Sequence, residues 1–147
     1  MTELEASSRR TGYRLLPHVA DVIVEAWAPD RPGCLDAAVK GLVATFADPG
    51  RAAPDGRVEF GFEAASDEEV LVRLLDEVIF LVDAHGLVPL TVTLFDADGA
   101  VRGWFATVPV DMVEETGAVP KGISRSGLEF GYDARARRWH CRVIVDV

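Results

Sequence analysis

The order of hydrophobic patterns along the chain most constrains what it can fold into. Apolar residues alternate with a period of two at Tyr13 and Leu15, at Val22, Val24 and Ala26, and over residues 58–64. They recur at helical spacing over residues 35–46 and 70–82. From Leu90 onward only period-two runs follow. Strands and helices do not alternate strictly, so a doubly wound parallel sheet is disfavoured. The order predicts an α+β fold, with a mostly antiparallel sheet and two helices packed on one face.

Local signals fix the ends of the second helix and the extent of the domain. Ser66 followed by Glu69 has the spacing of a capping box, and Gly86 is suited to end the same helix. The chain has 147 residues, of which 49% are hydrophobic, which is enough to bury one core. We expect residues 1–12 to form a loose N-terminal segment and residues 13–147 to form a single domain.

Composition and charge exclude several classes of function. The formal net charge of −9 argues against unspecific attraction to a nucleic-acid backbone, so no direct nucleic-acid binding is expected. No apolar run is long enough for a membrane helix, and the N-terminus lacks a signal peptide, so we expect a cytoplasmic protein. No glycine-rich phosphate loop is present. The isolated Cys34 and Cys141 are expected to be reduced thiols.

The C-terminal end of the chain carries the strongest functional signal. Residues 143–145 read as a buried strand, which would hold the Asp146 side chain and the carboxylate of Val147 in a fixed place. Asp21 opens another strand among apolar neighbours, where an ionised carboxylate needs hydrogen bonds, a cationic partner or a metal. If Asp21 lies beside the chain end, the three groups form an oxygen-rich site for a divalent cation. Ca²⁺, Mg²⁺ and Mn²⁺ all remain open.

Each of these residues also has a simpler interpretation. Asp21 alone is typical of a turn residue that accepts hydrogen bonds from backbone amides. His18 is typical of a strand-edge residue, and its alternative role is to hydrogen-bond a residue that binds the metal. A small hydrolase that uses Asp21 with His18 is a further alternative. Asp76 and Glu77 are adjacent on the second helix and point about 100° apart, which favours a solvated or partner-facing surface over a catalytic pair.

Several segments resemble the archease family. The motif His18-Val19-Ala20-Asp21-Val22 has the family's form His-x-Ala-Asp-Val. Other matching segments follow in family order, at residues 71–81, 121–124, 127–129 and 139–147. The resemblance extends over residues 13–147.

This resemblance implies an accessory protein and not an enzyme. Archeases assist an RNA ligase of the RtcB family, which uses GTP and divalent metal in tRNA splicing and RNA repair. They speed formation of the ligase-guanylate intermediate and permit multiple turnover. Carried over by position, the metal ligands would be Asp21, Asp146 and Val147 through its carboxylate. A possible partner surface would include Asp76, Glu77 and Lys121.

The chain also departs from the family pattern. Pro17 stands where archeases usually carry an acid, and residues 121–126 lack an aromatic residue and a His that the family often has. Residues 110–116 replace a region that often carries an Arg-His pair. An alternative is therefore a divergent archease-fold module that binds a cation or acts as a chaperone or adaptor for another protein.

Overall fold

The computed structural model describes residues 10–17 and 21–147, and within them the strands form two larger antiparallel sheets. The first has the order β1-β2-β9-β8, with bounds Gly12–Pro17, Asp21–Ala28, Arg138–Asp146 and Gly122–Asp133. The second has the order β4-β6-β5, with bounds Gly56–Glu63, Ala100–Pro109 and Leu87–Ala97. A short pair joins β3 (Ala47–Asp48) to β7 (Glu114–Glu115), and η1 (Val110–Met112) precedes β7.

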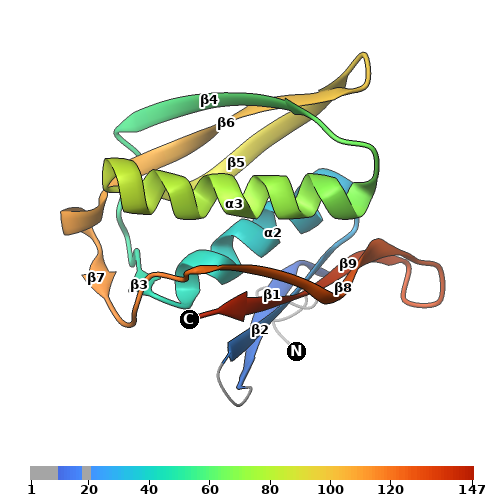
Figure 1. Cartoon of the computed structure of the whole chain (residues 1–147), viewed down its shortest axis with the longest axis horizontal. Helices are drawn as coiled ribbons and strands as arrows, with labels where there is room; N and C mark the ends of the chain where they lie inside the picture. Colours follow the sequence, from blue (N-terminus) through green and yellow to red (C-terminus); the bar gives the residue numbers. More distant parts are fainter. Residues whose placement is uncertain (1–9, 18–20) are drawn as a thin grey trace.

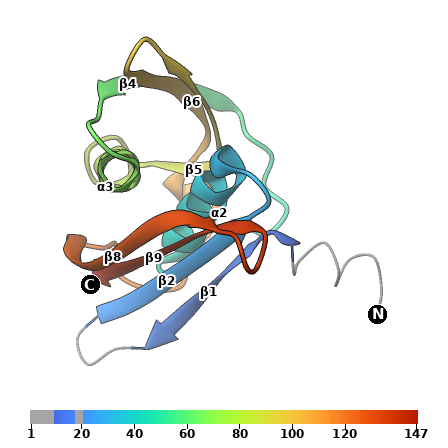
Figure 2. The same ribbon diagram turned by 90° about the vertical axis from the view of Figure 1, so that its right-hand side faces the viewer.

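Two helices lie between the larger sheets. The helix α2 (Arg31–Ala44) contacts β1, β2 and β9 on one side and β5 on the other. The helix α3 (Asp67–His85) contacts β8 and β5 in the same way. Figures 1 and 2 show the resulting order of sheet, helices and sheet. The predicted α+β class with two helices and mostly antiparallel strands is confirmed; the division of the strands between two sheets, with helices in the middle, is a feature that the sequence did not reveal.

The second helix has the ends that its sequence predicts. The Ser66 side chain accepts a hydrogen bond of 3.2 Å from the N–H of Glu69, which satisfies one of the exposed amides of the first turn. The Glu69 side chain accepts in return from the N–H of Ala65, at 3.2 Å. Gly86 ends the helix with φ of 62°, a left-handed conformation that costs glycine little. These caps define where α3 begins and ends.

The core lies between the layers, and both cysteines lie in it. Cys34 of α2 donates a hydrogen bond to the Ala26 carbonyl of β2, with a sulfur-to-oxygen distance of 3.6 Å, and Cys141 of β9 is the strand partner of Ala26. A hydrogen bond with Cys34, together with burial, raises the pKa of the Cys141 thiol well above its ordinary value. Both thiols are free and buried, as the sequence predicted for reduced cysteines.

The described part of the chain contains no helix that combines the length and the apolar character needed to cross a membrane. The predicted loose segment 1–12 lies mostly outside the described residues.

Candidate functional site

Two aspartates from opposite ends of the chain meet at one end of the first sheet. Asp21 is the first residue of β2 and Asp146 is the last residue of β9. These strands pair antiparallel with Asp21 directly opposite Asp146. Side chains at directly opposite positions project from the same face, with Cβ atoms about 5 Å apart. The structure therefore brings together the two side chains on which the metal prediction depends.

The two aspartates project from the outer face of the sheet, away from the helices. Val24, Val143 and Val145 are fully buried against the helices. Asp21 and Asp146 have the opposite side-chain direction because neighbouring residues in a strand alternate between faces. Asp21 is half-buried and Asp146 is exposed, so the pair is open to solvent and to ions.

The other side of Asp146 is formed by the beginning of β8. Gly122 pairs with Asp146 there, and the N–H of Lys121 donates a hydrogen bond of 2.7 Å to the Asp146 carbonyl. A Cβ added at Gly122 would meet no atom within 4 Å, so the space beside Asp146 is open. Val147 follows directly and is 38% exposed. Lys121, predicted to belong to a partner surface, is thus attached through its backbone to the strand end that carries the acids.

The donor set fits a hard divalent cation in its chemistry. Carboxylate oxygens are the ligands that Ca²⁺, Mg²⁺ and Mn²⁺ prefer, and like charges at this spacing repel unless a cation or a proton relieves them. Within residues 10–17 and 21–147, no three His, Cys, Asp or Glu side chains gather in a way that could hold a metal ion. The predicted set supplies only two such side chains and one main-chain carboxylate. The remaining ligands would be carbonyl oxygens or water.

His18, which is predicted to support the metal ligands, lies outside the described residues together with Val19 and Ala20. Its contribution to the site stays a prediction.

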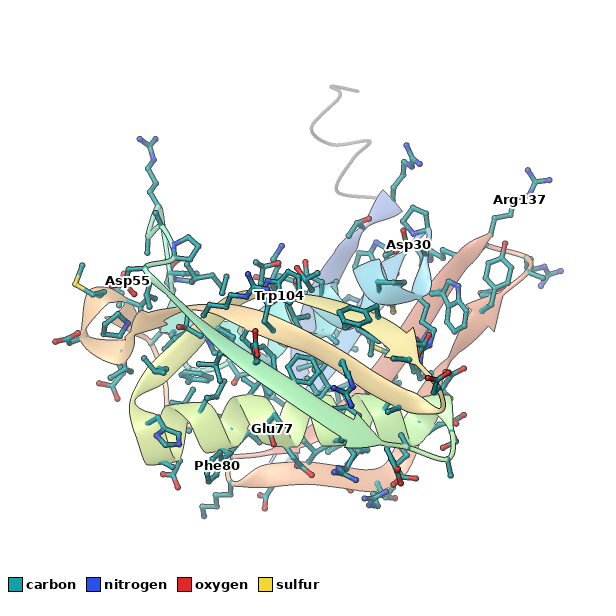
Figure 3. All side chains as sticks on the ribbon, turned by 90° about the horizontal axis from the view of Figure 1, so that it is seen from above. Asp30, Asp55, Glu77, Phe80, Trp104 and Arg137 are labelled. Carbon is teal, nitrogen blue, oxygen red and sulfur yellow. The ribbon has the colours of Figure 1, made fainter. Side chains whose placement is uncertain are left out.

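Asp76 and Glu77, the other predicted partner residues, lie on α3 where this helix packs against β8. Figure 3 shows Glu77 and the exposed Phe80 on this helix. Partial burial raises the pKa of the Asp76 carboxyl above its usual value of 3.8, while the positive charges of Arg125 and Arg73 oppose this shift. Asp76 thus lies near β8, whereas the acids of the candidate metal site lie at the end of β9.

One charged group on the outer face of the sheet was missed by the sequence analysis. Glu25 of β2 is only 9% exposed, and its carboxylate contacts Arg14 of β1, with Nη2 at 2.6 Å and Nε at 2.7 Å. Arg142 of β9 lies on its other side, with Nε 4.0 Å from the second carboxylate oxygen. Their order across the strands, Arg14, Glu25, Arg142, forms an ionic row in the middle of the sheet. Only the strand register shows that these charges are neighbours.

Two of the segments that depart from the family pattern include irregular parts of the fold. The pairing of β8 with β9 shifts register between Ser124 and Glu129, and Gly127 within this stretch has φ of 71°. Residues 110–116 form η1 and the short strand β7. Changes at such positions alter surface shape more readily than the paired strands do.

Comparison with known proteins settles the family. The sequence model of the Archease protein family (MTH1598/TM1083) matches residues 13–147. The chain belongs to the archease family. It is 39% identical over 137 residues to proteins named "Probable protein archease" from Mycobacterium tuberculosis strains CDC 1551/Oshkosh and ATCC 25618/H37Rv. The alignment covers 93% of this chain and 75% of each of those proteins.

A solved archease structure shows the same fold. The solution structure of Methanobacterium thermoautotrophicum protein 1598 superposes with a TM-score of 0.70 and 20% sequence identity. The match covers 92% of this chain and 99% of that one. The two proteins therefore share the arrangement of two helices and antiparallel sheets.

Proposed function

We propose that this archease-family protein binds a divalent cation through Asp21, Asp146 and the carboxylate of Val147. We propose further that it activates a GTP-dependent RNA ligase of the RtcB family in tRNA splicing and RNA repair. The observation that carries the first part is the register, which sets Asp21 opposite Asp146 at the open end of the sheet. Family membership supports the second part.

Electrostatic repulsion gives the cation its role in this geometry. Strand pairing places the Cβ atoms of Asp21 and Asp146 about 5 Å apart, and carboxylates carried at this spacing repel each other when both are ionised. The backbones of the two strands are anchored by Val24 of β2 and by Val143 and Val145 of β9, which are all fully buried. A bound cation relieves this repulsion. The site is thus organised before the ion arrives.

The residues around the ion would divide two tasks. Asp21, Asp146 and the terminal carboxylate would hold the cation, and the lack of a side chain at Gly122 leaves room for water or a partner oxygen. When bound, the cation supplies positive charge that neutralises phosphate or carboxylate oxygens. Lys121 stands at the edge of this site and is exposed, where it can contact an acidic group of the partner.

Cation binding is tested by calorimetric titration with Ca²⁺, Mg²⁺ and Mn²⁺. We expect at least one of the three ions to bind the unaltered protein. Asp21→Asn should weaken binding at least tenfold, and a Gly-Ser extension after Val147, which moves the terminal charge while keeping the side chain, should weaken it as well. Asp55→Asn is the matched control because Asp55 is an exposed acid elsewhere on the surface. Equal affinity in Asp21→Asn and the unaltered protein would reject the site.

Ligase activation is tested with a cognate ligase, GTP and an RNA pair that carries a 2′,3′-cyclic phosphate and a 5′-hydroxyl. With the ligase substoichiometric to RNA, we expect the protein to raise the number of turnovers and to speed labelling of the ligase by GTP. Asp21→Asn should lose both effects.

The two experiments together distinguish a ligase activator from the alternative function. A protein that binds the cation but leaves ligase turnover unchanged is not a ligase activator. It would instead be an archease-fold module that serves a different protein, as the changes at residues 121–126 and 110–116 allow.

A further inference from the structure

The hairpin between β8 and β9 concentrates positive charge in an acidic protein. Over residues 133–142 the chain has four arginines and one aspartate, although the whole chain has a net charge of −9. The turn itself carries Arg135 and Arg137, and Arg138 and Arg142 belong to β9. This hairpin is the basic end of a sheet whose other end carries Asp21 and Asp146.

Two of these arginines are available to a ligand. The acid beside the turn bonds to the backbone and not to an arginine side chain, because the Asp133 carboxylate accepts hydrogen bonds from the N–H groups of Arg135 and Ala136, at 3.0 and 3.1 Å. Arg142 faces Glu25. Arg135 and Arg137 are exposed and form no ion pair with any residue in the described part of the chain. Figure 3 shows Arg137 extending away from the body of the protein.

The backbone of the turn holds these side chains in a defined arrangement. Asp133 and Arg138 are strand partners, and the four residues between them close the hairpin. Arg137 has φ of 55°, a left-handed conformation that is uncommon for residues other than glycine. The two hydrogen bonds to Asp133 stabilise the same turn. Arg135 and Arg137 are therefore displayed from a fixed base.

An exposed aromatic ring lies at the root of the hairpin. The Tyr132 side chain is 55% exposed, and its ring centroid is 6.1 Å from that of Trp139. Trp139 in turn lies 5.5 Å from Phe130, which is only 6% exposed and belongs to the core. This row of rings anchors Tyr132 while leaving more than half of it open to solvent. An aromatic surface of this kind can stack on a base.

We propose that the β8–β9 hairpin binds a single-stranded nucleic acid. Arg135 and Arg137 would pair with two backbone phosphates, and Tyr132 would stack on a base between or beside them. An acidic protein segment would also satisfy the arginines and could pack on the tyrosine, so the test includes an acidic peptide as the competing ligand. A nucleic-acid strand accounts for both features. This inference goes beyond the proposed ligase activation and does not depend on it.

The acids at the other end of β9 do not oppose this binding, because they are far from the hairpin. The nine residues of β9 place the hairpin about 26 Å from Asp146 at about 3.3 Å per residue. This distance is roughly three Debye lengths at physiological salt, so the acidic end is largely screened at the hairpin.

The test is fluorescence anisotropy of labelled 12-nucleotide RNA and DNA strands of the same sequence, titrated with the metal-free protein at several salt concentrations. We expect both strands to bind more tightly than a duplex. Arg135→Ala/Arg137→Ala should weaken binding at least tenfold and reduce the slope of log affinity against log salt by about 1.4. Tyr132→Ala should weaken binding by about tenfold, and Tyr132→Phe should retain it.

A second double arginine variant of the same protein serves as the control. Arg51→Ala/Arg57→Ala removes the same charge from residues close to Asp55 in the sequence, and Figure 3 shows Asp55 on the opposite side of the molecule from Arg137; binding should stay within about twofold. An equal loss in this control, or no binding of any strand at 50 mM salt, overturns the proposal. Tighter binding of a polyglutamate peptide than of RNA or DNA, unaffected by Tyr132→Ala, would assign the surface to an acidic protein instead and would also overturn it.

Discussion

The two ends of β9 carry opposite charge, so one strand contributes to an acidic surface at one end and to a basic surface at the other. At its C-terminal end Asp146 faces Asp21, so two acids of like charge are held together by strand pairing. At its N-terminal end the arginines of the hairpin extend into solvent, and the nearby Asp133 is used by the backbone of the turn. Between them lies the ionic row of Arg14, Glu25 and Arg142. The net charge of the whole chain therefore does not indicate the local charge at either end of the strand.

The ionic row in the middle of β9 should contribute most to stability, because it links three neighbouring strands. Glu25→Ala leaves Arg14 and Arg142 without their common partner, and we expect it to lower the free energy of unfolding by about 2–3 kcal/mol. Urea denaturation measures this change. Glu129→Ala is the control, because Glu129 is the exposed strand partner of Arg142 and should cost under about 0.5 kcal/mol. Equal costs for the two variants would mean that Glu25 does not hold the strands together.

The next effect tests whether the acidic end is a cation site. A cation that binds only the folded state stabilises it by about 2.7 kcal/mol at one hundred times its dissociation constant. We expect the thermal midpoint of the unaltered protein to rise by several degrees in that ion, and the rise to disappear in Asp21→Asn/Asp146→Asn. The Arg135→Ala/Arg137→Ala variant should keep the full rise. A rise of the same size in all three proteins would show that the ion acts elsewhere.

A smaller effect concerns an acid away from both ends. Because burial raises the pKa of Asp76 in the folded protein, its charged form is disfavoured by folding, and this cost is present above the folded pKa. Asp76→Asn should therefore raise stability at pH 7 by a few tenths of a kcal/mol, a small value since solvent screens a partly exposed group. The gain should vanish as the pH falls below about 4. Thermal melts at pH 7 and pH 3.5 decide the sign, and an increase at low pH alone would contradict it.

Removing the two exposed arginines of the hairpin should hardly change the stability of the protein. Arg135→Ala/Arg137→Ala should leave the free energy of unfolding within about 0.5 kcal/mol of the unaltered protein, because both side chains are exposed and unpaired within the described chain. Urea denaturation again provides the measurement. A loss of 2 kcal/mol would mean that these arginines support the fold, and the contrast between a binding end and a structural middle would fail.

Local signals in the sequence were sufficient to predict much of the fold. The caps at Ser66 and Gly86 and the hydrophobic repeat between them located α3, because these depend on neighbours a few residues apart. The apolar run before Asp146 and the alternation after Asp21 predicted strands, and the structure shows them as β9 and β2. The division of the strands into two sheets depends on which strands pair, and hydrophobic alternation does not specify a partner.

The candidate site was predicted only in part for the same reason. Asp21 and Asp146 could be named from their positions at strand ends, and the register then placed them opposite each other. Glu25 reads as an ordinary outward residue until Arg14 and Arg142 are placed on either side of it. The arginines of the hairpin were visible in the sequence, but their availability depends on Asp133 bonding to the turn. Cation binding and the contribution of His18 stay predictions.

The two enclosed thiols have a practical consequence. Cys34 and Cys141 are the chain's two cysteines, and both are sealed inside the core, where Cys141 remains protonated. A cysteine introduced at the surface would then be the sole site that alkylating dyes reach in the native protein. Fluorophores could be attached at either pole of β9 without first removing the natural cysteines, so that occupancy of each pole could be followed in the same molecule.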